Sequence, residues 1–289
     1  MLSIIIPSRN EKYLERTIQD LLEKCTGEFE IIAVLDGYDP PERTIDPRVS
    51  YIHRPVAGGL RNAVNDGVKA AKGKYLMKID AHCLVDKGFD EKMTSVCEDN
   101  WIVVPRRYRL DADKWERIPA EVKMYVDYEK LPYPWNFNPP ELHGFRDEER
   151  TRKNAHIMID DTMLMQGSCW VMKKSWFEKN GFMTLVGYGT ACAQESSELC
   201  FTTWLRGGRV VVNKNTWYAH YRKSEETGGR GYRENNHDRR VAMQYSSEFW
   251  LTDKLTDKVH DFRWLLDKFI PDKAERIMRK AKEQTKWTD

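Results

Sequence analysis

The sequence predicts an α/β fold with a mostly parallel sheet flanked by helices. Short apolar runs that suit buried strands alternate with segments whose apolar residues recur at helical spacing. Strands joined by helical segments of about a dozen residues pair in parallel through crossover connections. Aspartates directly follow two of these strands, at the sheet edge where ligands of such folds bind.

The first half of the chain holds the elements of this sheet. Buried apolar runs predict strands over residues 2–6, 31–35, 49–52, 75–79 and 102–104. Pro7 and Pro105 follow the first and the last of these runs, and we expect them to end both strands. Apolar residues at helical spacing predict helices over 14–22 and 60–71, each with a glycine shortly after it as a stop signal.

The second half is less regular. Residues 105–165 are rich in Pro, Tyr and Trp without a sustained period, and so long an irregular stretch is usually functional or mobile. An apolar pattern resumes over 167–172 as a strand, followed by a helix over 195–205 and a short strand over 209–212. Residues 223–289 are polar and then amphipathic, which predicts a C-terminal helical extension.

The composition is that of an ordinary globular protein, with 40% hydrophobic and 32% charged residues. Lys and Arg number 47 against 45 Asp and Glu, so the net charge of +2 gives no global argument for a polyanionic partner. We find no signal-peptide pattern and no apolar run near the roughly 20 residues that span a bilayer. The six cysteines form no CxxC pair, so we expect reduced thiols in a cytoplasmic protein without a transmembrane segment.

Asp80 and His82, which follow the strand at 75–79, are the sharpest chemical signal. A carboxylate at a strand end with an imidazole two residues on points two ligands at one spot. Divalent cations such as Mn²⁺ or Mg²⁺ bind few protein ligands and complete their shell with water and phosphate oxygens. Taken alone, the pair slightly favours an aspartate that caps a helix and a packed histidine, because D-x-H occurs often by chance.

Seven short segments carry a family resemblance. They are IIIPSRNE at 4–11, VLD at 34–36, GGLRNA at 58–63, DAHC at 80–83, TM and QGS within 162–168, ESSEL at 195–199 and YAHYR at 218–222. In this order they resemble the family 2 glycosyltransferases of the GT-A group, and most of all the polypeptide N-acetylgalactosaminyltransferases. The resemblance implies a GT-A catalytic domain over 1–222, with a nucleotide-sugar half (1–104) and an acceptor half (105–222).

The resemblance also implies a UDP-sugar donor and a set of site residues. Asp80, His82 and His220 match the metal ligands, with Mn²⁺ or Mg²⁺ as the cofactor, and Glu195 joins Asp80 as a catalytic residue. The donor site would comprise Pro7, Ser8, Arg9, Asn10, Glu11, Asp36, Gly59, Arg61, Asn62, Gln166 and Gly167. A cation at a helix start, where the helix dipole favours an anion, also points Arg61 toward a diphosphate.

Ser196 departs from the family pattern. Inverting members carry Asp directly after the Glu of this helix, as the base that deprotonates the acceptor, and retaining relatives carry Asn. A serine hydroxyl does not act as a base unaided, so both stereochemical outcomes stay open. Glu195 is then the remaining candidate for the base or for orienting the acceptor.

The acceptor is the least constrained part of the prediction. Residues 106–109 and 222–240 mix cations with aromatics, as single-strand or flipped-base binders do, which makes a hydroxymethylated DNA base a candidate acceptor. Residues 101–160, however, hold 11 Lys or Arg and 11 Asp or Glu, so they form no basic stripe. The alternatives are a protein or glycan acceptor, a non-catalytic nucleotide-sugar-binding protein, and a nucleotidyltransferase, although residues 7–10 lack a Gly-rich phosphate loop with a lysine.

Overall fold

The computed structural model describes residues 1–132, 142–223, 229, 232 and 235–285, and one large sheet runs through them. Its strands are β1 (Leu2–Ser8), β2 (Phe29–Asp36), β3 (Val49–Arg54), β4 (Tyr75–Ile79), β5 (Cys83–Val85), β6 (Trp101–Asp111), β7 (Glu116–Arg117), β10 (Ile159–Asp161), β11 (Cys169–Lys173) and β12 (Arg209–His220). The strands β8 (Glu129–Lys130) and β9 (Phe145–Arg146) pair separately.

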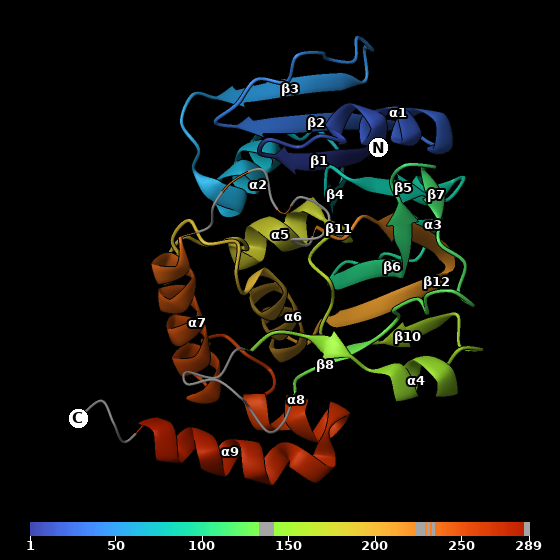
Figure 1. Cartoon of the computed structure of the whole chain (residues 1–289). Coiled ribbons are helices and arrows are strands. Elements are labelled where there is room, and N and C mark those ends of the chain that lie inside the picture. The colour runs from blue at the N-terminus through green and yellow to red at the C-terminus, as the bar shows by residue number, and fades with distance from the viewer. Residues whose placement is uncertain (133–141, 224–228, 230–231, 233–234, 286–289) are drawn as a thin grey trace.

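The helices cover both faces and one end of this sheet (Figure 1). They are α1 (Leu14–Lys24), α2 (Gly59–Ala70), α3 (Phe89–Thr94), α4 (Glu148–Lys153), α5 (Lys174–Asn180), α6 (Glu195–Leu205), α7 (Asn236–Leu251), α8 (Phe262–Phe269) and α9 (Pro271–Thr285). The strand order is β10-β12-β6-β11-β4-β1-β2-β3, with β5 beside β12 and β7 beside β6.

The part of the sheet formed by β1 to β4 is parallel. β1 pairs with β2 and β4, and β2 pairs with β3. Alternate side chains of β1 enter two cores: Ile5 packs in one with Val64 of α2, and Ile6 packs in the other with Ile18 of α1. The carboxyl ends of β1, β2 and β4 therefore meet at one edge, which is where ligands bind in such sheets.

The other part of the sheet is mixed. β11 lies antiparallel between β4 and β6, whereas β12 runs parallel to β6 and pairs antiparallel with β10 and β5. Within the large sheet, every antiparallel pair among the described strands involves β5, β7, β10 or β11. The predicted α/β sheet flanked by helices is confirmed, and β12 continues well beyond the short strand expected at 209–212.

Two expected strand ends are wrong, because β1 and β6 continue through their prolines. Pro7 lies beyond Ile5, the last residue of β1 that pairs with β4. Pro105 lies beyond Val103, where the pairing of β6 with β11 ends, and beside a register shift in β12. Proline is tolerated in a strand at edges and irregularities, where its missing N–H costs no ladder hydrogen bond.

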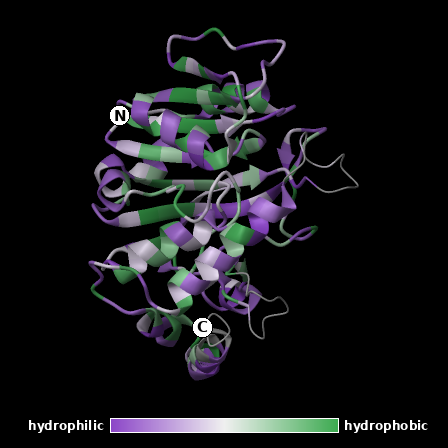
Figure 2. Cartoon of the chain, turned by 90° about the vertical axis from the view of Figure 1, so that its left-hand side faces the viewer, coloured by the Kyte–Doolittle hydropathy of each residue, from purple (hydrophilic) through white to green (hydrophobic). Residues whose placement is uncertain are grey.

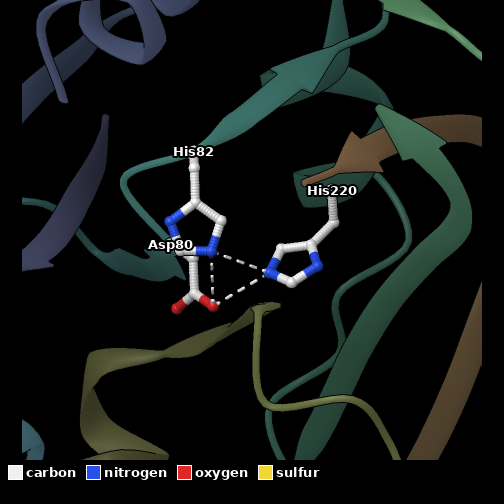
Figure 3. A group of neighbouring side chains, drawn as sticks. All are labelled: Asp80, His82 and His220. Atoms are coloured by element: carbon white, nitrogen blue, oxygen red, sulfur yellow. Dashed lines mark hydrogen bonds and ion pairs between the residues drawn. The ribbon is translucent and has the colours of Figure 1, made fainter. Parts of the chain in front are cut away.

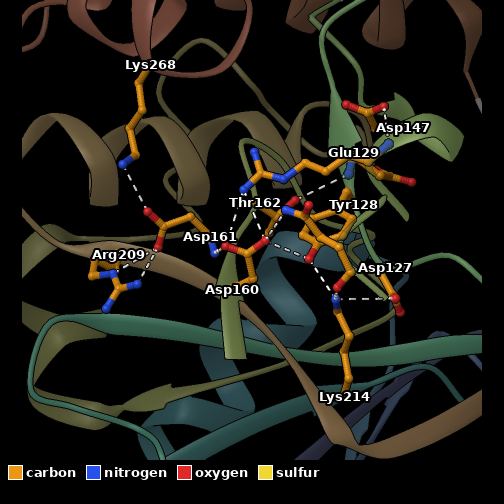
Figure 4. A network of polar contacts seen from close by, with 12 residues as sticks. Asp127, Tyr128, Glu129, Asp147, Asp160, Asp161, Thr162, Arg209, Lys214 and Lys268 are labelled. Carbon is orange, nitrogen blue, oxygen red and sulfur yellow. Dashed lines mark hydrogen bonds and ion pairs between the residues drawn. The ribbon is translucent and has the colours of Figure 1, made fainter. Parts of the chain in front are cut away.

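Residues 105–165, expected to be irregular, contain α4 and several short strands in their described part. A buried polar network ties them to the sheet (Figure 4). Tyr128 Oη donates to Asp160 Oδ2 (2.7 Å) and accepts from Lys214 Nζ of β12 (2.7 Å). Arg106 of β6 donates to both carboxyl oxygens of Asp127, at 2.8 and 2.7 Å. These contacts fix β8 beside the sheet.

The C-terminal helices pack against α6. Phe201 of α6 meets Trp250 of α7 and Phe262 of α8, with ring centroids 5.4 and 5.2 Å apart. These side chains belong to the same hydrophobic cluster as Ile5 and Val64. Apolar residues concentrate in the central strands, whereas the outward helix faces are mostly hydrophilic (Figure 2). Over the described residues, no helix has both the length and the apolar character needed to cross a bilayer.

Candidate active site

A cavity of about 1120 Å³ opens at the carboxyl edge of the parallel strands. Its lining comes from the loops after β1, β4 and β12, from β6 and β9, and from the starts of α2, α6 and α7. Most of the sequence-predicted site residues line it: Pro7, Ser8, Arg9, Glu11, Asp36, Gly59, Asp80, His82, Gln166, Gly167, Glu195 and His220.

Three of these residues offer ligand atoms to one point (Figure 3). One oxygen of Asp80 and one ring nitrogen each of His82 and His220 all lie within 4.8 Å of one another. His220 Nε2 is 3.2 Å from Asp80 Oδ2 and 3.1 Å from His82 Nε2. A carboxylate and two imidazoles at this spacing could hold a divalent cation.

The sheet brings the two histidines together. Asp80 follows β4 directly, and His82 precedes β5. β5 pairs with the end of β12, in the register Cys83 to His220, so residues far apart in the sequence become neighbours. The pairing of β5 with β12 thus adds His220 to the two candidate ligands that follow β4.

The surroundings prepare these side chains to bind a cation. Burial lowers the pKa of His220 to about 4, so its imidazole is neutral at pH 7, which is the charge state that binds metal ions. Burial alone would raise the pKa of Asp80, but the charge of Lys78 and the hydrogen bond from His220 hold it well below its ordinary value. His82 Nδ1 lies 3.2 Å from Glu11 Oε2, an arrangement that orients metal-binding imidazoles.

Lys78 links the Asp80 carboxylate to the start of α6. Its ammonium lies 2.7 Å from Asp80 Oδ1 and 3.7 Å from Glu195 Oε2, and it donates to the carbonyl of Gly167 at 2.5 Å. Trp170 Nε1 donates to Glu195 Oε1 at 3.0 Å. A Cβ on Gly167 would lie 2.7 Å from Glu195 Oε2, so this glycine makes room for the carboxylate. Glu195 is therefore held in place by a cation and an indole.

Asp36 anchors the loop that begins α2. Its carboxylate accepts hydrogen bonds from the backbone N–H groups of Gly58 (2.7 Å) and Gly59 (2.9 Å) and pairs with Arg54 at 3.0 Å. Gly59 has a φ of 83°, and a Cβ there would overlap the carbonyl oxygen of Thr190. The glycine thus lets two cavity-lining loops meet.

Three expected donor-site residues, Asn10, Arg61 and Asn62, are not part of the cavity lining. Arg61 is fully buried, forms an ion pair with Glu198 of α6, and donates to the carbonyl of Thr184 at 3.1 Å. Asn62 donates to the carbonyl of Gly58 at 2.7 Å. The placement of Arg61 does not support the expected diphosphate contact, because its guanidinium already forms an ion pair with a buried carboxylate.

The cavity also holds residues that the sequence prediction did not single out. Glu129 of β8 is only 3% exposed, and neither of its carboxyl oxygens has a hydrogen-bond partner among the described residues. Burial raises its pKa to about 7, although Arg107 and Arg146 oppose the rise. Lys78 could have been found from the sequence, because a lysine inside the apolar run at 75–79 is unusual. Glu129 lies in an irregular stretch, where no local pattern marks it as buried.

The serine at the position of the family base is also engaged. Ser196 Oγ donates to the carbonyl oxygen of Met165 at 2.5 Å, and the backbone N–H of Met165 lies 3.4 Å from the same hydroxyl. The hydroxyl thus ties α6 to the chain before Gln166.

Known proteins share this fold and parts of this sequence. Over 135 residues the chain is 32% identical to "Uncharacterized glycosyltransferase EpsJ" of Bacillus subtilis (strain 168), covering 43% of this chain and 38% of that protein. Over 267 residues it is 27% identical to polypeptide N-acetylgalactosaminyltransferase 13 of Rattus norvegicus, covering 86% of this chain and 47% of that protein. The matches thus span about half or less of the length of these relatives.

Solved structures give the same picture of the fold. A crystal structure of GalNAc-T7 with UDP, GalNAc and Mn²⁺ has a TM-score of 0.73 at 16% identity, covering 96% of this chain and 58% of that chain. A structure of S. aureus TarS 1-349 with UDP-GlcNAc has a TM-score of 0.56 at 13% identity, covering 95% and 72% of the two chains. The sequence model of the family "Glycosyl transferase family 2" matches residues 3–181, which is more than half of the sequence. The chain therefore belongs to glycosyl transferase family 2, with a GT-A fold that resembles the catalytic domains of the polypeptide N-acetylgalactosaminyltransferases.

Proposed function

We propose that this chain transfers a sugar from a UDP-sugar to an acceptor hydroxyl, and that Asp80, His82 and His220 hold the divalent cation that the reaction needs. The observation that carries the proposal is the convergence of these three ligands on a large cavity at the carboxyl edge of the sheet. Two imidazoles beside one carboxylate suit Mn²⁺ better than Mg²⁺, which prefers an all-oxygen shell.

The residues around this point suit the departure of a nucleoside diphosphate. A bound divalent cation supplies positive charge to the diphosphate as it leaves. Lys78 balances the charge of Asp80, with which it pairs at 2.7 Å, and thereby keeps the cation available to the donor. Glu11 orients His82 from the far side and is itself paired with Lys223. The donor would lie along 7–11, Asp36 and Gly59, with Gln166 and Gly167 on its sugar side.

Glu195 is proposed to orient the acceptor or the transferred sugar. Its carboxylate is clamped by Lys78 and by the indole of Trp170, so it presents a fixed negative charge. Such a clamp favours a hydrogen-bonding role over proton abstraction, because the ammonium and the indole hold the two carboxyl oxygens in fixed positions.

We propose a catalytic domain over 1–222, with a nucleotide-sugar half and an acceptor half, and the origin of the lining residues supports this division. The donor and metal ligands lie mainly in 1–104, and we assign the acceptor side to 105–222. The extension 223–289 adds Asn235, Asp238 and Arg239 to the cavity border. A hydroxymethylated DNA base is the acceptor we propose first, and a protein or glycan hydroxyl is the alternative.

Release of UDP from a panel of UDP-sugars with Mn²⁺ tests the proposal. Asp80→Ala should lower metal-dependent turnover about 100-fold or more, because several kcal/mol of charge stabilisation is lost. Asp99→Ala is a matched control, since the Asp99 side chain is 91% exposed. Full turnover in Asp80→Ala, or in the wild type with a chelator, would overturn the metal assignment.

The same assay separates the alternatives. Binding of UDP-sugars without release of UDP in the presence of any acceptor would favour a non-catalytic binder. Mass spectrometry of hydroxymethylated DNA, proteins and glycans after incubation identifies the acceptor. A gain of hexose on protein or glycan alone would reject the DNA acceptor while leaving sugar transfer intact.

A further inference from the structure

Three arginines, Arg107, Arg109 and Arg146, form a group in the cavity that we call the arginine cluster. Arg107 and Arg109 are two residues apart on β6, so their side chains leave the same face of the strand. Arg146 of β9 lies directly opposite Glu129 of β8. Two backbone hydrogen bonds between Arg107 and Val126, of 3.0 and 2.8 Å, join β6 to the chain just before β8. This pairing brings the arginines of β6 close to Arg146.

Among the described residues, no ion pair joins a carboxylate to these three guanidinium groups, whereas Arg106, Arg150 and Arg209 each pair with an aspartate. Arg107 donates to the neutral amide of Gln166. The neighbouring Arg106 is different, because it forms two hydrogen bonds to Asp127. The fold therefore supplies a carboxylate partner for the arginine on the other face of β6, whereas Arg107 of the cluster is paired with a neutral amide.

The cluster is crowded with like charge. Burial lowers the pKa of Arg109 to about 10, and the charges of Arg107, Arg146 and Arg222 add to the effect. Burial and Arg107 also lower the pKa of Arg146. The charges of Glu129 and Glu148 offset part of this lowering at Arg146. Guanidinium groups held together in this way favour the binding of an anion, because it relieves the repulsion between their charges.

The donor alone does not supply that anion. The diphosphate of a UDP-sugar carries about two negative charges, which one divalent cation balances. Lys78 pairs with both Asp80 and Glu195, so these three side chains together carry about one negative charge. Three further arginines are an excess over what the donor requires, so a second anionic group belongs in the cavity. The planar, forked guanidinium favours phosphate oxygens, which accept paired hydrogen bonds.

We propose that the arginine cluster binds a phosphate group of the acceptor and so selects a phosphate-bearing acceptor for the transferred sugar. The acceptor role in this inference rests on the proposed function. The anion site itself rests only on the arrangement of the three arginines. The competing source of the phosphate is the donor, whose diphosphate could extend from His220 toward Arg107. The experiment must therefore keep the donor site filled.

The test uses the whole chain saturated with UDP and Mn²⁺ and titrates it with methyl phosphate in a calorimeter. We expect binding to the wild type and at least tenfold weaker binding to Arg109→Gln and Arg146→Gln. The affinity for UDP should change less than twofold in both variants. Arg279→Gln on α9, where the side chain is 72% exposed, removes the same charge far from the cavity and should change neither affinity.

Two results would overturn the inference. Unchanged methyl phosphate binding in both variants would show that the cluster is not the site. Loss of methyl phosphate binding when UDP is present, together with weaker UDP binding in the variants, would assign the arginines to the donor. Arg146→Lys guards against misfolding: it keeps the charge and removes the fork, so it should bind methyl phosphate more weakly than the wild type and more tightly than Arg146→Gln.

A second arm examines the acceptor itself. A single-stranded oligodeoxynucleotide should bind with a salt dependence that becomes shallower in Arg146→Gln, because one phosphate contact is lost. An uncharged peptide nucleic acid of the same sequence should not bind at the cluster. Neither measurement needs turnover, so a failure of sugar transfer and a failure of this anion site give different results.

Discussion

The Glu11 carboxylate lies 3.2 Å from Nδ1 of His82, on the opposite side of the ring from the nitrogen that faces His220. A hydrogen bond to this carboxylate fixes the tautomer that leaves Nε2 unprotonated for a metal. Glu11 also pairs with Lys223, so it is itself held in place. The loop after β1 thus positions a ligand that lies between β4 and β5.

Glu11→Gln should therefore weaken Mn²⁺ binding about 10-fold to 100-fold, the range usual for residues that orient metal ligands. The Mn²⁺ dependence of UDP release, or direct calorimetry with Mn²⁺, measures the change. Glu28→Gln is the control, because the Glu28 side chain is 79% exposed. Equal Mn²⁺ affinity in wild type and Glu11→Gln would contradict an orienting role.

Glu129 should make the stability of the fold depend on pH. Its folded pKa of about 7 exceeds its ordinary 4.5, so the folded state holds the proton more tightly. The stabilisation is complete below about pH 4.5 and is lost as the pH rises through 7. Arg107 from β6 and Arg146 from β9 face this carboxyl, and the Cys200 thiol of α6 lies near it.

Glu129→Gln should remove this dependence. The variant should unfold at a higher temperature than the wild type at pH 8, with the advantage vanishing near pH 4.5. Because a tenfold change in proton affinity corresponds to about 1.4 kcal/mol, the full difference is on the order of 3 kcal/mol. Thermal unfolding at several pH values checks it, with exposed Glu121→Gln as the control. A pH-independent difference between variant and wild type would argue against a buried, ionising Glu129.

Regular elements were predictable because their burial is periodic along the chain. Residues of α1 such as Leu14, Ile18 and Leu21 recur at helical spacing and are buried together. The same logic failed at Pro7 and Pro105, because whether a proline ends a strand depends on the neighbouring strands. That information lies in the pairing with β4 and β11, which no local pattern contains.

The candidate site was predictable where each residue sits at a strand end. Asp80 and His82 follow β4, and parallel strands bring such ends together. The partners of a buried charge were not predictable, because they come from distant segments. Arg61 pairs with Glu198, 137 residues away, and Glu129 faces Arg146 across a pair of two-residue strands.

The burial of Arg61 against Glu198 leads to a stability prediction. Arg61→Ala should destabilise the fold by about 3 to 5 kcal/mol, because it leaves Glu198 buried without its partner. The double variant Arg61→Met/Glu198→Leu should recover much of this loss, since neither charge remains. Denaturant unfolding measures both, and Arg48→Gln, which breaks a surface pair with Asp46, should change the stability far less than Arg61→Ala.

The double variant also decides the role of Arg61 toward the donor. In the folded double variant, the UDP affinity should stay within about twofold of the wild type, because Arg61 does not line the cavity. A tenfold loss of UDP affinity in the folded double variant would show that the guanidinium contacts the donor after all.

Gly59 and Gly189 offer a matched pair for the donor loop. Both have positive φ, 83° and 53°, so alanine should cost each about 1 kcal/mol in backbone strain. Only at Gly59 would the added Cβ overlap the carbonyl oxygen of Thr190, whereas nothing lies within 4 Å of a Cβ at Gly189. Gly59→Ala must therefore separate the loop that Asp36 anchors from the loop before α6.

We expect Gly59→Ala to raise the KM for the UDP-sugar by about fivefold or more, while Gly189→Ala leaves it unchanged. Unfolding temperatures of the two variants correct for the shared strain. If both variants had the same KM and the same stability, the contact between Gly59 and Thr190 would not shape the donor site. A larger KM for Gly59→Ala at matched stability would instead locate the donor where α2 begins, beside the Asp36 carboxylate that holds this turn.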